Sequence, residues 1–415
     1  MSKVLQGVRV VEHGTFITGP AASMLLADLG ADVVKVEMPG TGDPFRAFKG
    51  GLYSPHYQTY NRNKRSITLD TRQPQDLARL DELIRGADVY IQNFRPGVAE
   101  KIGTGEARLR ALNPRLIYCA ISGFGQTGPS AHRPSYDTVA QATAGFLRLL
   151  VNPANPRVVG PAIADALTGF YAAYGILGAL YERAARVDPA PDEDVGRSVE
   201  VSMFEAMAHF NLDAFTHLFS EGEVMDAFSR PRVSQSYVMN CRDDKWIALH
   251  MSSPAKFWQG LAKAMERPDI FDDPRFATRE ARIDNQEAMM EVMGPVFRQK
   301  DRADWCARLL AEDVPHAPMY TAAEVPDDPQ ARHLQLFVET GHPVAGRFRT
   351  VRSPVSFDGR RSLDVTAPPL LGEHNEDFRN GWESASGKPD PQRDGQRDGQ
   401  RDPQRDGQRD GDHDR

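Results

Sequence analysis

The sequence is short of cysteine and of clustered positive charge, and each shortage excludes a class of protein. Three cysteines in 415 residues, Cys119, Cys241 and Cys306, are odd in number and far apart. A disulfide scaffold is therefore excluded, and reduced thiols in a core are expected. The 50 Lys and Arg are outnumbered by 57 Asp and Glu, which gives a net charge of −7. Because a general nucleic-acid binder needs clustered excess Lys and Arg, no nucleic-acid partner is expected.

Long apolar runs are also missing. The longest apolar stretch is Phe170–Tyr181, 12 residues, against the roughly 20 that span a bilayer. The first residues contain no uninterrupted apolar stretch of the length that a signal peptide needs. We therefore expect a soluble, cytoplasmic protein that does not bind membranes.

The end of the chain has no hydrophobic residue at all from Lys388 to Arg415. Between Gln392 and Gly411, Gln-Arg-Asp followed by Gly or Pro occurs five times in succession. Such a segment has nothing to bury, so residues 387–415 are predicted to be a disordered, low-complexity tail. The rest of the chain is long enough for two domains.

Alternating strand and helix patterns fill the first half of the chain and predict a doubly wound, Rossmann-like α/β domain with helices on both faces. Strands are expected over residues 8–12, 31–37, 66–69, 88–92 and 116–121, and helices over 21–30, 74–85 and 105–112. A long helix rich in Ala and Gly is expected over 165–185, followed by a strand and helix over 197–210.

The pattern then changes to that of a smaller α+β unit. A hairpin is expected over 236–250, helices near 254–266, 279–299 and 301–312, and a second hairpin within 338–364. The predicted organisation is a large domain (1–205), a linker (206–228), a small domain (229–330), a C-terminal return segment (331–386) and the tail (387–415).

The loop from Gly14 to Pro20 follows a strand and enters a helix, where free N–H groups and the helix dipole favour a phosphate. It lacks the G-x-G-x-x-G pattern, although Glu37 stands where a dinucleotide enzyme places its ribose-binding acid. By itself this loop is more typical of a structural turn than of a nucleotide site.

Two polar groups follow on later connections: Asn61–Arg65 with Arg72, and Asn93–Arg95 with Lys101. Each alone is typical of a solvated face. If the fold brings them to the first loop, they could surround a polyphosphate and hold a base against Phe94.

Asp165 begins the long helix and has two interpretations. A lone Asp there is most often an N-cap. Alternatively, it is a nucleophilic carboxylate, which the helix dipole keeps ionised and which lies near backbone N–H groups that stabilise an oxyanion. The histidines show no metal-ligand spacing, and no phosphate-binding P-loop or G-x-S-x-G motif is present, so no metal site is expected.

Several ordered motifs together resemble the class III CoA-transferases, the CaiB–BaiF family, from Leu5 to about Glu376. They are GVRVVEHGTFITGPAASMLLADLGADVVKVE, NRNKRSITLD, ADVYIQNFRPG, LIYCAISGFGQTGP, SYDTVAQATAG, IADALTGFYAAYGILGALYER and LLGEH. The resemblance implies a large Rossmann-like domain, a small domain and an interlocked homodimer. It also implies that Asp165 is the nucleophile. The CoA contacts that it implies are Phe16, Ile17, Thr18, Leu69, Arg72, Asn93, Phe94, Lys101, Arg133, Tyr136 and Asp137.

Two positions depart from the family pattern. Met38 stands where many members have an arginine near the adenine or phosphate, which puts that contact in doubt. The glycine-rich small-domain loop of formyl-CoA transferases is absent, so oxalate–formate exchange is less favoured.

The expected activity is reversible transfer of CoA from an acyl-CoA to a carboxylic acid, through an aspartyl anhydride and an aspartyl-CoA thioester, with no tightly bound cofactor. A related racemase of α-methylacyl-CoA is the first alternative. It would need a histidine where the chain has Ser135–Tyr136–Asp137, and the nearest histidine is His132. An NAD-dependent dehydrogenase, based on the predicted βαβ unit and Glu37, and a non-catalytic CoA-binding protein are further alternatives.

Overall fold

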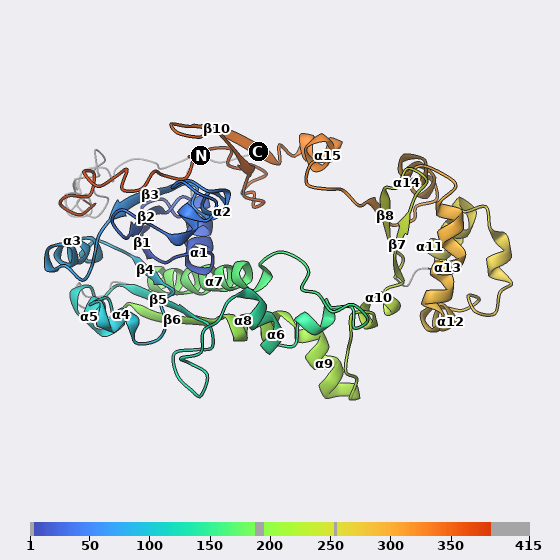
Figure 1. Cartoon of the computed structure of the whole chain (residues 1–415), viewed down its shortest axis with the longest axis horizontal. Coiled ribbons are helices and arrows are strands. Elements are labelled where there is room, and N and C mark those ends of the chain that lie inside the picture. The colour runs from blue at the N-terminus through green and yellow to red at the C-terminus, as the bar shows by residue number, and fades with distance from the viewer. Residues whose placement is uncertain (1–3, 187–194, 253–254, 383–415) are drawn as a thin grey trace, which may run out of the picture.

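The computed structural model describes residues 4–186, 195–252 and 255–382 (Figure 1). A six-stranded sheet forms its larger part, in the order β3-β2-β1-β4-β5-β6, and every pairing is parallel. The strands are β1 (Arg9–His13), β2 (Asp32–Glu37), β3 (Lys64–Thr68), β4 (Val89–Gln92), β5 (Ile117–Ser122) and β6 (Arg197–Ser202). The predicted parallel α/β sheet is confirmed. Its strand order reverses between β1 and β4, where ligands bind in such folds.

Helices cover both faces of this sheet because its strands are apolar on both sides. Val10 faces α1 (Thr18–Asp28) and α7 (Ile163–Ala185), whereas the next residue, Val11, faces α3 (Pro74–Arg85) and α5 (Glu106–Leu112). Side chains of successive strand residues point to opposite faces. The sheet is thus sandwiched between two apolar layers.

Helix α7 packs directly on α1, and Gly169 makes this approach possible. A Cβ at Gly169 would lie 2.7 Å from the Ala21 Cβ and 2.9 Å from the Thr18 carbonyl oxygen. Only a glycine fits at that separation. Since residues four apart share a helix face, the first turn of α7, which carries Asp165, lies beside the start of α1.

The second unit is built on a three-stranded antiparallel sheet of β7 (Ser236–Asn240), β8 (Trp246–His250) and β9 (His316–Pro318). Its core uses residues 237–314 only. The helices are α11 (Ala255–Ala264), α12 (Arg279–Asp284), α13 (Gln286–Phe297) and α14 (Arg302–Ala311). The single helix predicted over 279–299 is wrong, because the backbone leaves the helical conformation at Asn285. Strand β9 was not predicted.

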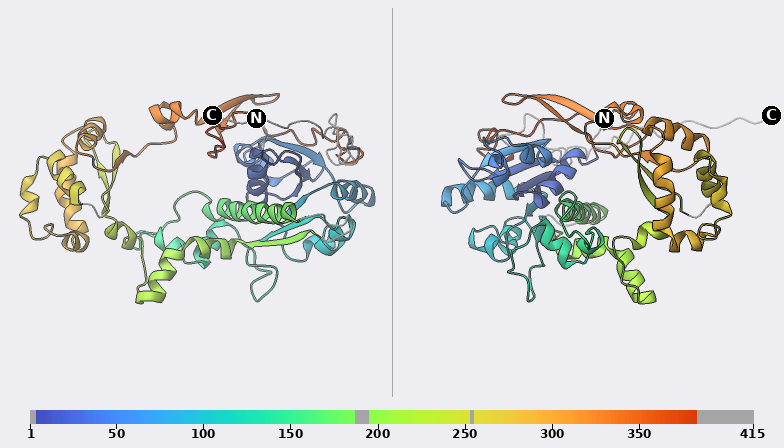
Figure 2. Two further views of the ribbon diagram at one scale, coloured as in Figure 1. Left: turned by 180° about the vertical axis from the view of Figure 1, so that it is seen from behind. Right: turned by 45° about the vertical axis from the view of Figure 1, so that its right-hand side comes forward.

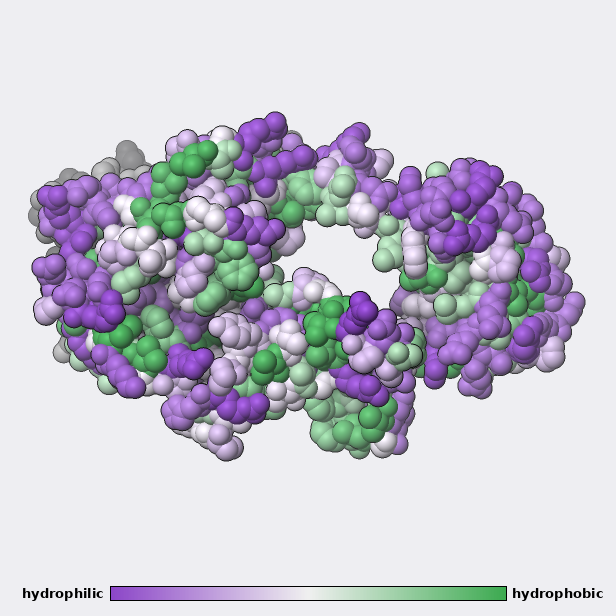
Figure 3. Space-filling model, in the orientation of Figure 1, coloured by the Kyte–Doolittle hydropathy of each residue, from purple (hydrophilic) through white to green (hydrophobic). Residues whose placement is uncertain are grey.

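The chain passes between the two units twice. It leaves through α8 (Met203–Phe210), α9 (Leu212–Glu221) and α10 (Ser229–Val233), and returns through α15 (Pro329–His333) and the hairpin β10 (Phe337–His342) and β11 (Gly346–Val351). The ribbon views and the space-filling view show an opening enclosed by these connections (Figures 2 and 3). The predicted linker therefore contains a helix, α9; the domain limits stay predictions.

The end of the described chain packs back on the large sheet. Trp382 and Phe378 are buried beside α3, and the indole N–H of Trp382 donates to the Leu83 carbonyl at 2.8 Å. The His374 backbone N–H donates to the Ser66 carbonyl at 2.9 Å. The segment after residue 331 thus supplies part of the large core. The predicted tail, residues 387–415, lies outside the described residues.

By length and composition alone, α7 is apolar enough to cross a membrane, although its longest uninterrupted apolar run is only Phe170–Tyr181. One face of this helix, including Ala172 and Ile176, lies in the core against the sheet. Core helices of soluble proteins have the same length and apolar composition.

Candidate active site

Four loops at the carboxyl ends of β1 to β4 enclose a cavity of about 220 Å³. Its position is at the reversal of strand order, between β1 and β4. The lining residues are His13, Gly14, Thr15, Val36, Glu37, Met38, Gly42, Asp43, Leu69, Asp70, Thr71, Arg72, Phe94, Val98 and Ile102.

Three predicted CoA contacts, Leu69, Arg72 and Phe94, line this cavity. The Arg72 guanidinium is 65% exposed and makes a bidentate pair with Asp70 at 2.8 and 2.9 Å. The Met38 sulfur lies 3.8 Å from the same guanidinium. Met38, the position that departs from the family pattern, therefore borders the Arg72 guanidinium, which Asp70 already pairs.

Asn93 fixes the first loop instead of presenting a free amide to the cavity. Its Oδ1 accepts from the Thr15 N–H at 3.0 Å, and its Nδ2 donates to the Thr15 carbonyl at 2.8 Å and to the Thr18 hydroxyl at 2.9 Å. Ile17 and Thr18 are buried. These residues shape the loop, and their contacts with CoA stay predictions.

The basic group Asn61–Arg65 is not where a polyphosphate site would need it. Arg62 pairs with Asp28 at 2.6 Å, and Lys64 pairs with Glu12 at 2.8 Å. Strand β3 begins at Lys64, so most of this group precedes the strand instead of following it. The interpretation of the group as a phosphate clamp is wrong.

Glu37 is likewise occupied. Arg46 binds both of its carboxylate oxygens at 2.7 Å, Ser66 donates to one of them at 2.7 Å, and the Asp43 N–H donates to the other at 3.0 Å. A carboxylate with four donors and 3% exposure has no capacity left for a ribose. Of the two observations on which the dehydrogenase alternative depended, the βαβ unit is present, and the availability of Glu37 is wrong.

Lys101 and Arg133 are exposed and do not line the cavity. Lys101 is the last residue of the short helix α4 (Val98–Lys101). The first residue of this helix, Val98, and the residue after it, Ile102, do line the cavity. Arg133 lies over the ring of Phe124 at 4.8 Å. Their roles in binding CoA stay predictions.

Asp165 lies in the first turn of α7 but is not its N-cap, which is Ala162. Asp137 takes the capping role from outside the helix. Its Oδ1 accepts from the backbone N–H groups of Ala164 at 2.7 Å and Asp165 at 3.3 Å, and its Oδ2 accepts from Gln141 at 2.6 Å. The carboxylate of Asp137 thus joins α7 to α6 (Asp137–Thr143) and leaves that of Asp165 free of this task.

The ionisation expected for Asp165 is also corrected. Burial, followed by the negative charge of Asp137, raises the pKa of Asp165 from 3.8 to about 7. Desolvation of the charged form therefore outweighs the helix dipole. Tyr60 belongs to the same environment, since burial and then the charges of Asp165 and Asp137 raise its pKa. No sequence motif pointed to Tyr60.

Phe16 connects the cavity with Asp165. It follows Thr15, which lines the cavity, and its ring lies edge-on to Tyr136 at 6.2 Å. Tyr136 is the N-cap of α6 and directly precedes Asp137. Phe16 and Ala162 also pack against the same apolar cluster. The structure therefore brings Phe16, Tyr136, Asp137 and Asp165 together at the edge of the loop that walls the cavity.

Among the described residues, His217, Glu221 and Glu223 have ligand atoms within 4.8 Å of one another and could hold a metal ion. Histidine spacing in the sequence does not indicate this group, because only one histidine takes part. The two glutamates are exposed, at or just after the end of α9. None of the three lines the cavity.

The comparisons with known proteins identify the family. The sequence profile of CoA-transferase family III matches residues 5–375. The chain belongs to CoA-transferase family III. It is therefore a class III CoA-transferase, of a family that uses CoA as substrate or intermediate.

Relatives cover most of the chain. The formyl-CoA:oxalate CoA-transferase of Streptomyces avermitilis is 33% identical, covering 92% of this chain and 96% of the relative. The succinyl-CoA–D-citramalate CoA-transferase of Chloroflexus aurantiacus is 31% identical, covering 90% of this chain and 92% of the relative. The human succinyl-CoA:glutarate CoA-transferase is 28% identical, covering 90% of this chain and 84% of the relative.

The fold is shared with solved structures. A CaiB/BaiF family protein from Brucella suis superimposes with a TM-score of 0.79 at 31% identity, covering 90% of this chain and 98% of that protein. Protein Rv3272 of M. tuberculosis superimposes with a TM-score of 0.78 at 28% identity, covering 91% of this chain and 99% of that protein.

Proposed function

We propose that this CoA-transferase moves CoA reversibly between an acyl-CoA and a carboxylic acid, with Asp165 as the nucleophile. The observation that carries the proposal is the position of Asp165. Its partly buried carboxylate lies in the first turn of α7, next to the loop that walls the cavity, and its backbone N–H donates to Asp137. Buried carboxylates with raised pKa values are typical of catalytic sites.

In the proposed reaction, the Asp165 carboxylate attacks the thioester carbonyl, the C–S bond breaks, and CoA thiolate leaves a mixed anhydride. The thiolate then attacks the aspartyl carbonyl and releases the donor acid, which leaves an aspartyl-CoA thioester. The acceptor carboxylate attacks this thioester, and the thiolate returns to the new acyl group. Asp165 ends as the free carboxylate, so no redox step occurs.

The chain's contribution is to present a poorly solvated nucleophile. Because burial raises the pKa of Asp165, the ionised form is less stabilised by water and gains more on attacking a carbonyl. The same burial keeps water from hydrolysing the activated aspartyl carbonyl. The backbone N–H groups of Ala164 and Asp165 already donate to Asp137, so the donors for the developing oxyanion must come from outside the first turn of α7.

Trapping tests the proposal directly. The wild-type enzyme is incubated with acyl-CoA and hydroxylamine or borohydride, and the modified peptide is mapped. Modification at Asp165, lost in Asp165→Asn but kept in the control Asp28→Asn, is the expected result. Modification confined to another residue would contradict the assignment.

Solvent deuterium separates the transferase from the racemase. A racemase incorporates deuterium at the α-carbon of a 2-methylacyl-CoA, and the proposed anhydride route does not. His132, the histidine nearest to the racemase position, is exposed. The pKa of Asp165 is influenced by burial and by the charge of Asp137, not by a histidine. Deuterium uptake in the wild type would overturn the proposal.

The acids are proposed only as a class, short carboxylic acids, because the relatives are named for oxalate, glutarate and citramalate. A screen of acyl-CoA donors against short mono- and dicarboxylic acids identifies the pair. The prediction against oxalate–formate exchange fails if formyl-CoA and oxalate are the preferred substrates.

We also propose that a second copy of the chain occupies the opening in Figure 3, as in an interlocked homodimer. Phe170, Tyr174 and Tyr181 share one side of α7 and are 57%, 75% and 77% exposed in the single chain, which is a large aromatic surface for a monomer. Light scattering is expected to give twice the chain mass. A monomeric wild type at micromolar concentration would contradict the dimer.

A further inference from the structure

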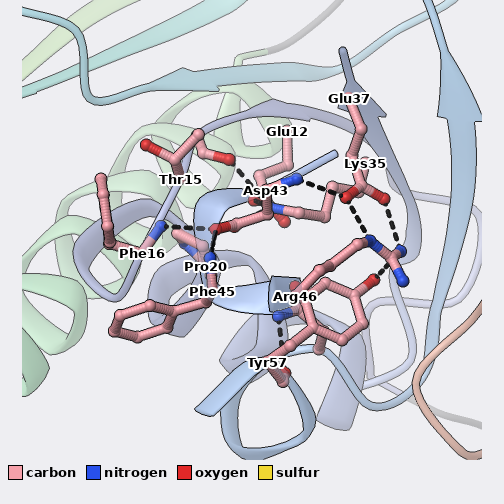
Figure 4. Close-up of polar contacts among 12 residues, drawn as sticks. Glu12, Thr15, Phe16, Pro20, Lys35, Glu37, Asp43, Phe45, Arg46 and Tyr57 are labelled. Carbon is pink, nitrogen blue, oxygen red and sulfur yellow. Dashed lines mark hydrogen bonds and ion pairs between the residues drawn. The ribbon is translucent and has the colours of Figure 1, made fainter. Parts of the chain in front are cut away.

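Six charged side chains form a buried network beneath the cavity. Figure 4 labels all of them except Lys64. Three are acidic and three are basic, so their formal charges cancel, and each is at most 3% exposed. The members are Glu12, Lys35, Glu37, Asp43, Arg46 and Lys64. Burying this many charges is expensive unless each finds a partner.

Direct ion pairs link the network. Lys35 lies 2.6 Å from Glu12 and 3.0 Å from Asp43. Glu12 also pairs with Lys64 at 2.8 Å, and Glu37 with Arg46 at 2.7 Å. Asp43 connects the two halves, because its backbone N–H donates to Glu37 at 3.0 Å.

Two members also hold the backbone of the first loop. The Lys35 ammonium donates to the Gly14 carbonyl at 2.8 Å. The Asp43 Oδ1 accepts from the Phe16 N–H at 3.2 Å and from the Phe45 N–H at 2.9 Å. Figure 4 shows the Asp43 carboxylate between Phe16 and Phe45. The network thus grips the loop on both sides of Thr15.

The conformation of this loop needs such support. Phe16 has φ of +62°, a left-handed conformation that costs a non-glycine residue free energy. A hydrogen bond from its N–H to an ionised carboxylate is strong enough to offset that cost. Gly14, Thr15 and Asp43 all line the cavity, so the shape of the cavity wall depends on this contact.

We propose that Lys35 and Asp43 are positioning residues that hold the Gly14–Phe16 loop in the shape that receives acyl-CoA. That CoA is the ligand rests on the proposed function; that the pair holds the loop does not. An apolar pair would fill the same space, but it would leave the Gly14 carbonyl and the Phe16 N–H without their present partners.

The first test is the substitution Asp43→Asn, with Asp28→Asn as its matched control. Asp28 also forms a largely buried ion pair, with Arg62 at 2.6 Å, and does not line the cavity. Asp43→Asn is expected to raise KM for acyl-CoA at least about tenfold with kcat within about threefold, the range of one charge-assisted hydrogen bond. Asp28→Asn should change both by less than about threefold. Equal effects of the two substitutions would overturn the proposal.

Hydrogen exchange provides a readout that is independent of activity. Exchange of the peptide containing residues 14–18 should be faster in Asp43→Asn and unchanged in Asp28→Asn. If Asp43→Asn does not fold, the wild type still decides: the Phe16 amide should exchange within about tenfold of the β1 amides. Exchange at the rate of an exposed loop amide would refute the positioning role.

The two proposals fail separately. If the wild type neither binds CoA in a calorimetric titration nor transfers it, the proposed function is wrong, and the exchange measurements still test the loop. If transfer is normal but the loop exchanges freely, only the positioning role is wrong.

Discussion

Replacing Gly169 by Ala tests the link between helix packing and catalysis. The new Cβ would lie 2.7 Å from the Ala21 Cβ and 2.9 Å from the Thr18 carbonyl oxygen, whereas carbon atoms in contact are normally about 3.5–4.0 Å apart. The shortfall of about 1 Å must be met by moving α7 away from α1. Asp165 lies one turn before Gly169 and moves with the helix.

Activity should respond more strongly than stability. Overpacking costs about 1–3 kcal/mol, but Ala in a helix regains about 1 kcal/mol relative to Gly. We therefore expect the free energy of unfolding to fall by at most about 2 kcal/mol. A displacement of about 1 Å at a reacting group costs on the order of 100-fold in kcat.

The assays are urea unfolding and steady-state transfer of CoA, with Ala21→Gly and the double variant completing a mutant cycle. Ala21→Gly alone should lower stability by about 1 kcal/mol. If the overlap with the Ala21 Cβ is the cause, Gly169→Ala should be less harmful in the Ala21→Gly background than in the wild type. A folded Gly169→Ala enzyme with kcat within about threefold of wild type, or strictly additive effects, would refute the reasoning.

The remaining predictions concern Asp165, Asp137 and Trp382. Because burial raises the pKa of Asp165 to about 7, kcat/KM should rise with pH up to about 7 and then level off; a profile flat from pH 5 to 8 would contradict this. The raised pKa means that the folded state binds the proton more tightly, so this group lowers stability as pH rises from about 4 to about 7. Asp165→Asn should therefore raise Tm at pH 8 but not at pH 4, and an equal shift at both would count against the pKa. Asp137→Asn should lower the apparent pKa of kcat/KM, because it removes the negative charge beside Asp165, and an unchanged profile would show that burial alone sets it. Trp382→Ala should lower the free energy of unfolding by about 3–5 kcal/mol, measured in urea; a loss below about 1 kcal/mol would show that the return segment does not stabilise the sheet.

The strand and helix pattern of the large sheet could be read from the sequence because its segments are strongly periodic. The helix predicted over 74–85 has the same limits as α3. The limits of the strands expected in the large sheet agree with the observed limits within two or three residues. Predictions failed where local signals were weak. Asn285 interrupts a continuous helical pattern, and the short strand β9 depends on pairing with a distant β8.

Charge was the least predictable feature. Lys64 and Arg62 are basic residues of the kind that bind phosphate. In the structure, however, Lys64 is paired with Glu12 and Arg62 with Asp28. Their partners are 34 or more residues away in the chain, so no local pattern distinguishes an ion-paired base from a free one. The same reason conceals the role of Asp43.

By itself, the sequence determined the family and hence the reaction class, because the ordered motifs along residues 5–375 can be recognised without knowing which residues are in contact. It also determined the parallel sheet, since period and turn residues are local properties. Only the tertiary structure decided the state of the site. The raised pKa of Asp165 depends on burial and on Asp137, 28 residues away, and the shape of the first loop depends on charges drawn from β1, β2 and the loop after β2. Desolvation and ion pairing are properties of the surroundings of a group, and the surroundings exist only once the chain has folded.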